Sequence, residues 1–137
     1  MKFKDSRYSE LLKHSKIEFP FGEFYLCDKF VIAELYEGIH FNWYKIEQVV
    51  DILREHYGDT IKIGYISNRI NSYSIDPKLW VDFQEQYGFI VASAIVTFNE
   101  FGYMNATIEK RFSEPSLKRC INLDEAINWI KNLKEFN

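Results

Sequence analysis

The chain has 137 residues, of which 47% are hydrophobic and 27% are charged, a composition typical of one globular domain. The formal charge of -3 and the lack of a basic stripe argue against a nucleic-acid-binding protein, because phosphate contacts need clustered Lys and Arg. The longest apolar run, residues 89–98, is well short of the ~20 residues that span a membrane. Charged residues interrupt the N-terminus too often for a secretory signal. We therefore expect a cytoplasmic protein without membrane insertion.

The two cysteines and three histidines show no metal-ligand spacing. Cys27 and Cys120 lie in apolar runs, so we expect buried free thiols, with a disulfide or a reactive thiol as the alternatives. The sequence also lacks the Gly-rich phosphate loops and the nucleophile motif of hydrolases. We therefore expect no cofactor, no metal site and no enzyme activity. The histidines are His14, His40 and His56.

The N-terminal part begins without clear periodicity. We expect residues 1–20 to be a loosely ordered arm that precedes a single domain over residues 21–137. Two short strands are predicted at 24–27 and 30–35, and Asp28-Lys29 supplies a two-residue turn between them.

Helices and strands then alternate along the rest of the chain. From Asn42 the apolar side chains recur every three or four positions, which predicts a helix that this Asn caps and that Gly58 ends. A second helix is predicted to open at Asp76-Pro77 and to end at Gly88. The other predicted elements are strands at 61–66, 89–97 and 116–121, and helices at 103–112 and from Asn122 onward.

This alternation predicts an α/β fold with a mixed, mainly parallel sheet of about five strands and about four covering helices. The N-terminal hairpin makes the sheet mixed. The segment 89–97 is nearly all apolar, so we expect helices on both of its faces.

Three stretches resemble the STAS/SpoIIAA-like proteins, whose fold is shared with Sec14-type lipid-binding domains. They are residues 30–38 (FVIAELYEG), residues 90–96 (IVASAIV) and residues 119–130 (RCINLDEAINWI). The resemblance covers roughly residues 22–134 and implies a SpoIIAA-like fold. The best-known members are anti-sigma-factor antagonists that are switched by phosphorylation of a Ser in an Asp-Ser-x-Gly loop. The matching residues 66–77 contain Ser67, Ser72 and Ser74 but no Asp-Ser-x-Gly.

The polar segment from Ser67 to Asp76 is the candidate binding loop, because ligands of open α/β sheets bind at the carboxyl ends of strands. The planar guanidinium of Arg69 is suited to an anion, and a phosphate on Ser74 would lie near a helix N-terminus. A partner-binding surface and a turn-rich connection without a ligand are the alternatives. The candidate residues are Ser67, Asn68, Arg69, Asn71, Ser72, Ser74 and Asp76.

The favoured function is a non-enzymatic regulatory or protein-interaction domain that acts through this loop and the following helix. The partner is another protein or a second copy of the chain. A carrier of a small apolar ligand, by analogy with Sec14, is the second hypothesis, and an enzyme of unidentified class is the third. For a homodimer, the candidate face is an apolar hairpin at the domain edge, formed by Phe19, Phe21, Phe24 and Tyr25, with packing of these rings within the same chain as the alternative.

Overall fold

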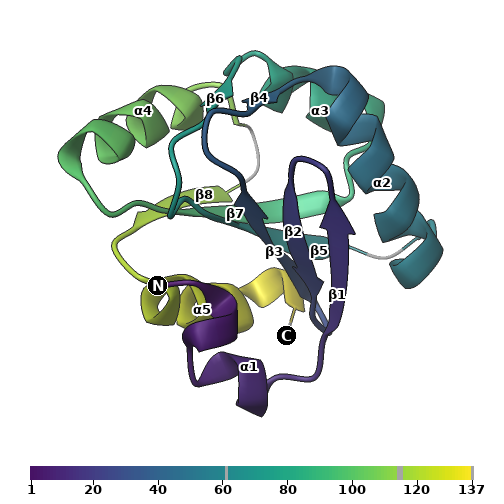
Figure 1. The fold of residues 1–137 in the computed structure, drawn as a ribbon. Coiled ribbons are helices and arrows are strands. Elements are labelled where there is room, and N and C mark those ends of the chain that lie inside the picture. Colours follow the sequence, from purple (N-terminus) through teal and green to yellow (C-terminus); the bar gives the residue numbers. More distant parts are fainter. Residues whose placement is uncertain (61, 114–115, 137) are drawn as a thin grey trace.

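The computed structural model describes residues 1–60, 62–113 and 116–136, and it contains one six-stranded sheet with helices on both faces (Figure 1). A separate two-stranded pair joins the segments that follow the third and fourth strands of that sheet. In spatial order the main strands are β1 (Ser15–Phe19), β2 (Gly22–Leu26), β3 (Phe30–Leu35), β5 (Ile63–Asn68), β7 (Ile90–Val96) and β8 (Ser116–Cys120), and the pair is β4 (His40–Phe41) with β6 (Ser74–Ile75).

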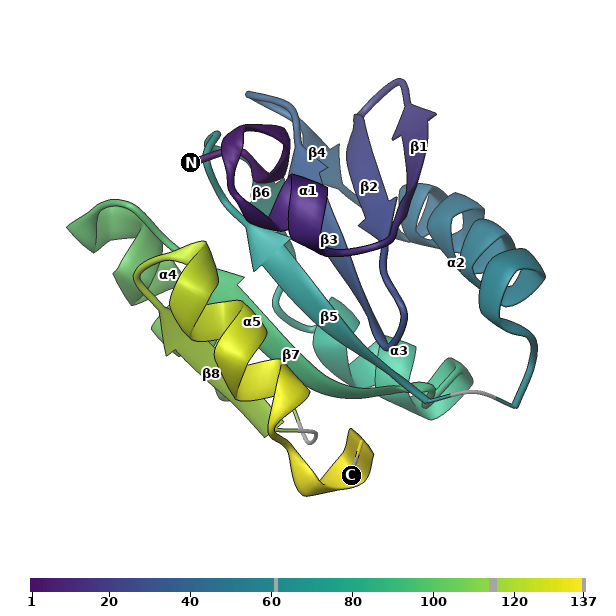
Figure 2. The same cartoon turned by 90° about the horizontal axis from the view of Figure 1, so that it is seen from below.

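The helices form one layer on each face of the sheet (Figure 1 and Figure 2). They are η1 (Phe3–Asp5), α1 (Tyr8–Leu11), α2 (Trp43–Tyr57), α3 (Leu79–Gln86), α4 (Glu100–Lys110), α5 (Leu123–Lys131) and η2 (Lys134–Phe136). α2, α3 and α4 pack on one face, while α5 and the N-terminal turns pack on the other. This confirms the predicted α/β class, with one strand more than expected because β1 joins the sheet.

The sheet is antiparallel at one end and parallel at the other. β1, β2 and β3 pair antiparallel, and the bond from Cys27 N to Phe30 O at 2.9 Å closes the predicted turn at Asp28-Lys29. Among the described residues only glycines have positive φ, which excludes a type I′ turn here. β3, β5, β7 and β8 pair parallel, and α2, α3 and α4 make the crossovers between them.

Three Asn side chains start the longer helices. Each accepts a hydrogen bond from the backbone N–H three positions on, at 3.1 Å for Asn42, 2.7 Å for Asn99 and 2.8 Å for Asn122. The predicted caps at Asn42 and Asn122 are confirmed. The helix predicted at 103–112 begins earlier, at Glu100, because Asn99 caps it.

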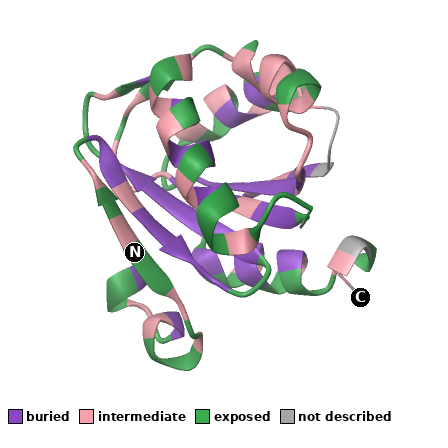
Figure 3. Ribbon diagram, turned by 90° about the vertical axis from the view of Figure 1, so that its right-hand side faces the viewer, coloured by how far each residue is buried: buried purple, intermediate pink, exposed green. Residues whose placement is uncertain are grey.

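Strand β7 lies inside the parallel part of the sheet and is covered on both faces. Every one of its residues except Val91 is buried (Figure 3). Ala94 packs under α5 with Ala126, whereas Ile95 packs under α4 with Ala106. The predicted two-sided burial of this strand is confirmed, and its small side chains allow the helices to approach closely.

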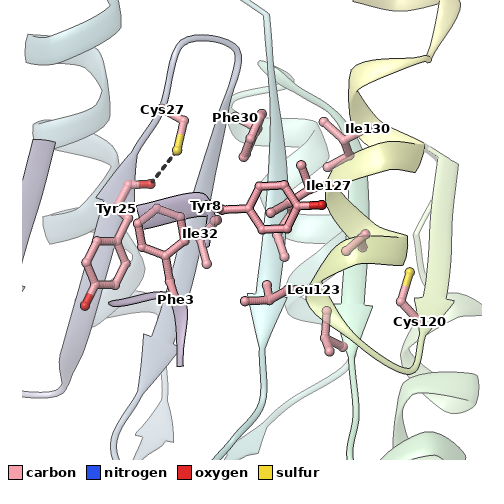
Figure 4. Close-up of a cluster of buried hydrophobic side chains, with 14 residues drawn as sticks. Phe3, Tyr8, Tyr25, Cys27, Phe30, Ile32, Cys120, Leu123, Ile127 and Ile130 are labelled. Carbon is pink, nitrogen blue, oxygen red and sulfur yellow. Dashed lines mark hydrogen bonds between the residues drawn. The ribbon is translucent and has the colours of Figure 1, made fainter. Parts of the chain in front are cut away.

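The N-terminal segment differs from the loosely ordered arm expected at residues 1–20. It forms η1, α1 and β1, and the side chain of Phe3 is fully buried, with its ring 4.6 Å from that of Tyr25 (Figure 4). Tyr8 donates a hydrogen bond to the carboxylate of Asp124 at 2.5 Å. The helical turns here have three and four residues, too few to produce a periodic apolar pattern.

The apolar hairpin face expected at the domain edge is used within the chain. Phe21, Phe24 and Tyr25 are at most 3% exposed. Phe19 stacks on Phe21 with ring centroids 5.0 Å apart. Phe21 and Phe24 pack in the cluster that α2 covers, whereas Tyr25 packs against Phe3 on the other face of the sheet, so these three rings are used within the chain.

Truncating Phe3 tests the packing of the N-terminal segment. We expect Phe3→Ala to lower the free energy of unfolding by about 3–5 kcal/mol, the usual cost of emptying a buried aromatic site. Leu11→Ala is the matched control, because Leu11 lies in the same segment and is 68% exposed. Urea unfolding of the full chain measures both, and equal stability of the two variants would show that the segment is loosely held.

Candidate functional site

A partly enclosed pocket of about 80 Å³ lies between α2, α3 and the sheet. Its apolar wall comes mainly from α2, which presents side chains at helical spacing toward the sheet. α3 closes the opposite side through Leu79 and Phe83. The α2 residues are Ile46, Val49, Val50 and Leu53.

α3 is the least buried wall of the pocket. None of its residues, all of which are described, is fully buried. Aromatic contacts hold its C-terminal end: the Phe83 and Tyr87 ring centroids are 5.2 Å apart, and Tyr87 stacks on Trp43 of α2 at 5.9 Å. α3 is therefore the wall that costs least to displace.

Arg69 lies in the polar wall of the pocket and is held by a buried ion pair behind that wall. Arg69, one residue beyond β5, contacts Glu109 of α4 through both terminal nitrogens, and the Nη2–Oε1 distance is 2.6 Å. The two side chains are only 12% and 3% exposed. Trp80 of α3 donates its ring N–H to the same Oε1 at 3.0 Å. The carboxylate therefore links α4 to both β5 and α3.

Hydroxyl groups extend this network toward β6. Arg69 Nε donates to Ser67 Oγ at 3.0 Å, and that oxygen lies 2.7 Å from the Tyr73 hydroxyl. Burial alone lowers the pKa of Arg69, but Tyr73 and Glu109 raise it above the usual value overall, so the guanidinium stays charged. Burial raises the pKa of Tyr65, which also lines the pocket, and keeps its hydroxyl neutral.

Ser93 of β7 is the polar residue of the pocket that lacks a partner. It is 1% exposed, and its Oγ has no hydrogen bond within the part of the chain that the structure describes. A buried hydroxyl without a partner costs about 1–3 kcal/mol. Such a group calls for an explanation, and a bound molecule or water is the usual one. The sequence alone did not single out Ser93.

The residues of the predicted binding loop lie on both faces of the sheet. Ser67 and Arg69 reach the pocket, whereas Asn68 points to the face under α5, because successive strand side chains alternate. The Arg69 guanidinium, which the sequence offers to an anion, is occupied by Glu109. The loop residues therefore do not converge on one site.

Other candidate residues stabilise the loop itself. Asn71 Nδ2 donates to the carbonyl of Leu35 at 3.1 Å, and the amide of Ser72 donates to the Glu37 carboxylate at 2.7 Å. Asp76 accepts from the amide two residues on at 3.0 Å. These bonds fit the alternative of a turn-rich connection.

Ser74 lies in β6, exposed, with its Oγ 2.7 Å from His40 Nδ1 across the β4–β6 pair. α3 begins five residues later, at Leu79. Phosphorylation of Ser74 stays a prediction, and a phosphate there would lie beside His40 rather than at the first turn of α3.

A second buried polar pair lies on the other face of the sheet, and sequence analysis missed it. Glu34 of β3 is 3% exposed, and its Oε2 accepts from Asn68 Nδ2 at 2.7 Å and from Phe3 N at 2.8 Å. The same Nδ2 donates to the Met1 carbonyl at 2.9 Å. Strand alternation is the signal that could have revealed this pair. Glu34 lies two residues after the buried Ile32, and residues two apart in a strand point to the same face.

This carboxyl group has the surroundings of a protonated acid. Within the described residues, Glu34 Oε1 and Asn68 Oδ1 have no hydrogen-bond partner, and both are acceptors. Burial raises the pKa of Glu34 above its ordinary value of 4.5, although the bonds from Phe3 and Asn68 lower it. A raised pKa favours the protonated carboxyl, which supplies an O–H donor beside acceptors that lack one.

The cysteines are free and buried, as predicted. Burial raises the pKa of both Cys27 and Cys120 to about 12, so neither forms a thiolate near neutral pH. Within the described ranges, no three His, Cys, Asp or Glu side chains lie close enough to hold a metal ion. In that same part of the chain, no helix has the length and apolar content needed to cross a bilayer.

Comparison with known proteins identifies the fold. No family model matches the sequence, and no curated protein matches it. Among solved structures it is similar to an uncharacterized protein from the DUF3478 family with a SpoIIAA-like fold from Shewanella loihica PV-4. The TM-score is 0.52 at 13% sequence identity, over 87% of this chain and 93% of that chain. The chain therefore has the SpoIIAA-like fold that the resemblance predicted, which by itself assigns no function.

The ion pair can be tested by a double-mutant cycle. We expect Glu109→Leu to lower the free energy of unfolding by about 3–5 kcal/mol, because it leaves the buried Arg69 charge unpaired. Arg69→Met combined with Glu109→Leu should cost less than Glu109→Leu alone. Urea unfolding of the variants measures this difference. If the double variant is the less stable of the two, the pair is not buried as described.

The protonation of Glu34 predicts a pH dependence. A raised pKa in the folded state stabilises the protein below the ordinary pKa and loses that stabilisation as pH rises through the raised value. We therefore expect the unfolding free energy of the native chain, minus that of Glu34→Gln, to fall as the pH rises above the ordinary carboxyl pKa. The Gln amide makes the same bonds without titrating. A difference that is flat or rises with pH contradicts a protonated Glu34.

Proposed function

We propose that this chain is a non-enzymatic binding domain that holds a small, mainly apolar molecule in the pocket between α2, α3 and the sheet. The observation that supports this most is Ser93, whose buried hydroxyl faces an apolar cavity without a partner. Natural proteins keep such a destabilising group at functional sites more often than in the core. A ligand with one polar atom would complete its hydrogen bonding.

The size of the pocket restricts the ligand. About 80 Å³ is more than the roughly 10–15 Å³ that one water requires, and about half of the ~150 Å³ apolar cavity that holds benzene. Lipid and cofactor sites are several times larger, on the order of 300–1,000 Å³. We infer a ligand of about one ring in size, seated by a small outward shift of α3, instead of the lipid that a Sec14-like carrier would hold.

The polar wall favours binding over catalysis. The carboxylate behind this wall, Glu109, is not among the residues that line the pocket, and it already accepts bonds from Arg69 and Trp80, so it is not free to act as a base. Among the fully buried side-chain polar atoms of the pocket in the described chain, Ser93 Oγ is therefore the one with hydrogen-bonding capacity to spare. A hydroxyl can both donate and accept, which suits a ligand hydroxyl or carbonyl.

The proposal is tested with two probes of equal size, phenol and toluene, titrated into the full chain and followed by NMR. We expect phenol to bind more tightly than toluene, by roughly five- to tenfold for one hydrogen bond, with shifts at Val50 and Ser93. Ser93→Ala should remove this preference without abolishing binding. Val50→Phe, which fills the pocket, should abolish binding of both probes.

Ser72→Ala serves as the control, because Ser72 is exposed and its side chain lies outside the pocket. Without any ligand, Ser93→Ala should be as stable as the native chain or more stable by about 1 kcal/mol, since it removes an unpaired buried hydroxyl. Probe affinities that neither Ser93→Ala nor Val50→Phe changes, or no binding of either probe, contradict the proposal.

A further inference from the structure

Helix α4 carries an apolar stripe on its outer face. Phe101, Met104 and Ile108 are 75%, 62% and 48% exposed, and Phe112, just beyond the helix, is 39% exposed. Their spacing of three, four and four residues places them on one side of the helix. Single exposed apolar residues are common, but a contiguous stripe of large ones marks an interaction surface.

The inner face of α4 is already occupied. Ala106 is fully buried against Ile95 and Leu117, and Glu109 is held by Arg69 and Trp80. These contacts fix the rotation of α4 about its axis. The stripe therefore cannot turn inward, and it can lose contact with water only against another molecule.

We propose that the stripe is the contact surface of a homodimer in which α4 packs antiparallel against α4 of a second copy. The flanking charges point to this partner and orientation. At 100° per residue, Glu100 and Arg111 fall within about 20° of each other on one flank of the stripe, at opposite ends. Both are exposed, and Arg111 keeps helical dihedral angles (φ -66°, ψ -21°).

A two-fold axis perpendicular to the helices preserves this flank and reverses the direction of the helix. Glu100 of each copy then lies beside Arg111 of the other, and the charge contact forms twice. Parallel packing about a two-fold axis along the helices would put the two copies of each charge at the same level on opposite flanks, so no contact between Glu100 and Arg111 would form. The stripe is thus self-complementary in shape and in charge only when the helices are antiparallel.

The size of the stripe sets the expected affinity. It spans 11 residue steps, roughly 16 Å of helix, so the interface falls below the ~1,200 Å² of stable complexes. We therefore infer a reversible dimer with a dissociation constant in the micromolar range. This inference does not depend on the ligand pocket.

The test is sedimentation of the full chain over a range of concentrations. The native chain should shift from the 16.4 kDa monomer toward twice that mass. Ile108→Glu should abolish the shift, whereas Tyr44→Glu should not, because Tyr44 is 73% exposed on α2, away from the stripe. Glu100→Arg and Arg111→Glu should each weaken association by roughly tenfold.

The decisive arm is an equimolar mixture of Glu100→Arg and Arg111→Glu. In the mixed dimer each of the two contacts pairs an Arg with a Glu, so association should recover. A monomer at every concentration, a dimer that survives Ile108→Glu, or a mixture that does not recover overturns the proposal. Binding of a monomeric chain to vesicles of phosphatidylglycerol and phosphatidylcholine would assign the stripe to a membrane and also overturn it.

Discussion

The buried ion pair between Arg69 and Glu109 fixes the arrangement of the elements around the pocket. It joins the residue after β5 to α4, and the bond that Trp80 donates to Glu109 adds α3. Ser67 accepts from Arg69 and lies within hydrogen-bond distance of the Tyr73 hydroxyl, which adds the segment before β6. Leaving either charge unpaired in the interior costs several kcal/mol. The four segments are therefore held at one point, and the pair links α4 to the apolar cluster that β5, β6 and α3 share.

Both the proposed ligand pocket and the proposed dimer surface on α4 follow from this constraint. With Glu109 turned inward, the neighbouring Ile108 must face outward, and it carries the stripe of Phe101 and Met104 with it. On the inner side, the ion pair occupies the guanidinium of Arg69 that borders the pocket, and Ser93 is left as a fully buried pocket group that can still bond. Glu109 thus occupies the guanidinium of Arg69 beside the pocket and also fixes which side of α4 faces outward.

Local signals in the sequence were sufficient for most elements of the fold. Asn42 could be identified as a cap because the helix it starts has a regular apolar stripe, and residues 90–96 could be identified as a covered strand because almost all are apolar. The Arg69–Glu109 contact could not be predicted, because its partners are 40 residues apart and no periodic pattern links them. Phe3 was missed for a related reason, since its short turn is stabilised by distant parts of the chain.

The candidate loop shows the same limit. Its residue types suggested a polar binding site, but strand alternation sends Asn68 to the opposite face from Ser67, where it meets Glu34. Which face each residue would serve depended on where β5 ends. The structure extends it to Asn68, whereas the sequence placed its end at residue 66.

The most direct measurement of the central claim is a crystal structure of the full chain, purified from its native cells, that shows bound solvent and ligands. The account predicts density for a small organic molecule between α2 and α3, with a polar atom at hydrogen-bond distance from Ser93 Oγ. A Ser93 hydroxyl bonded only to protein atoms or to water, in a pocket closed by side chains, would contradict it.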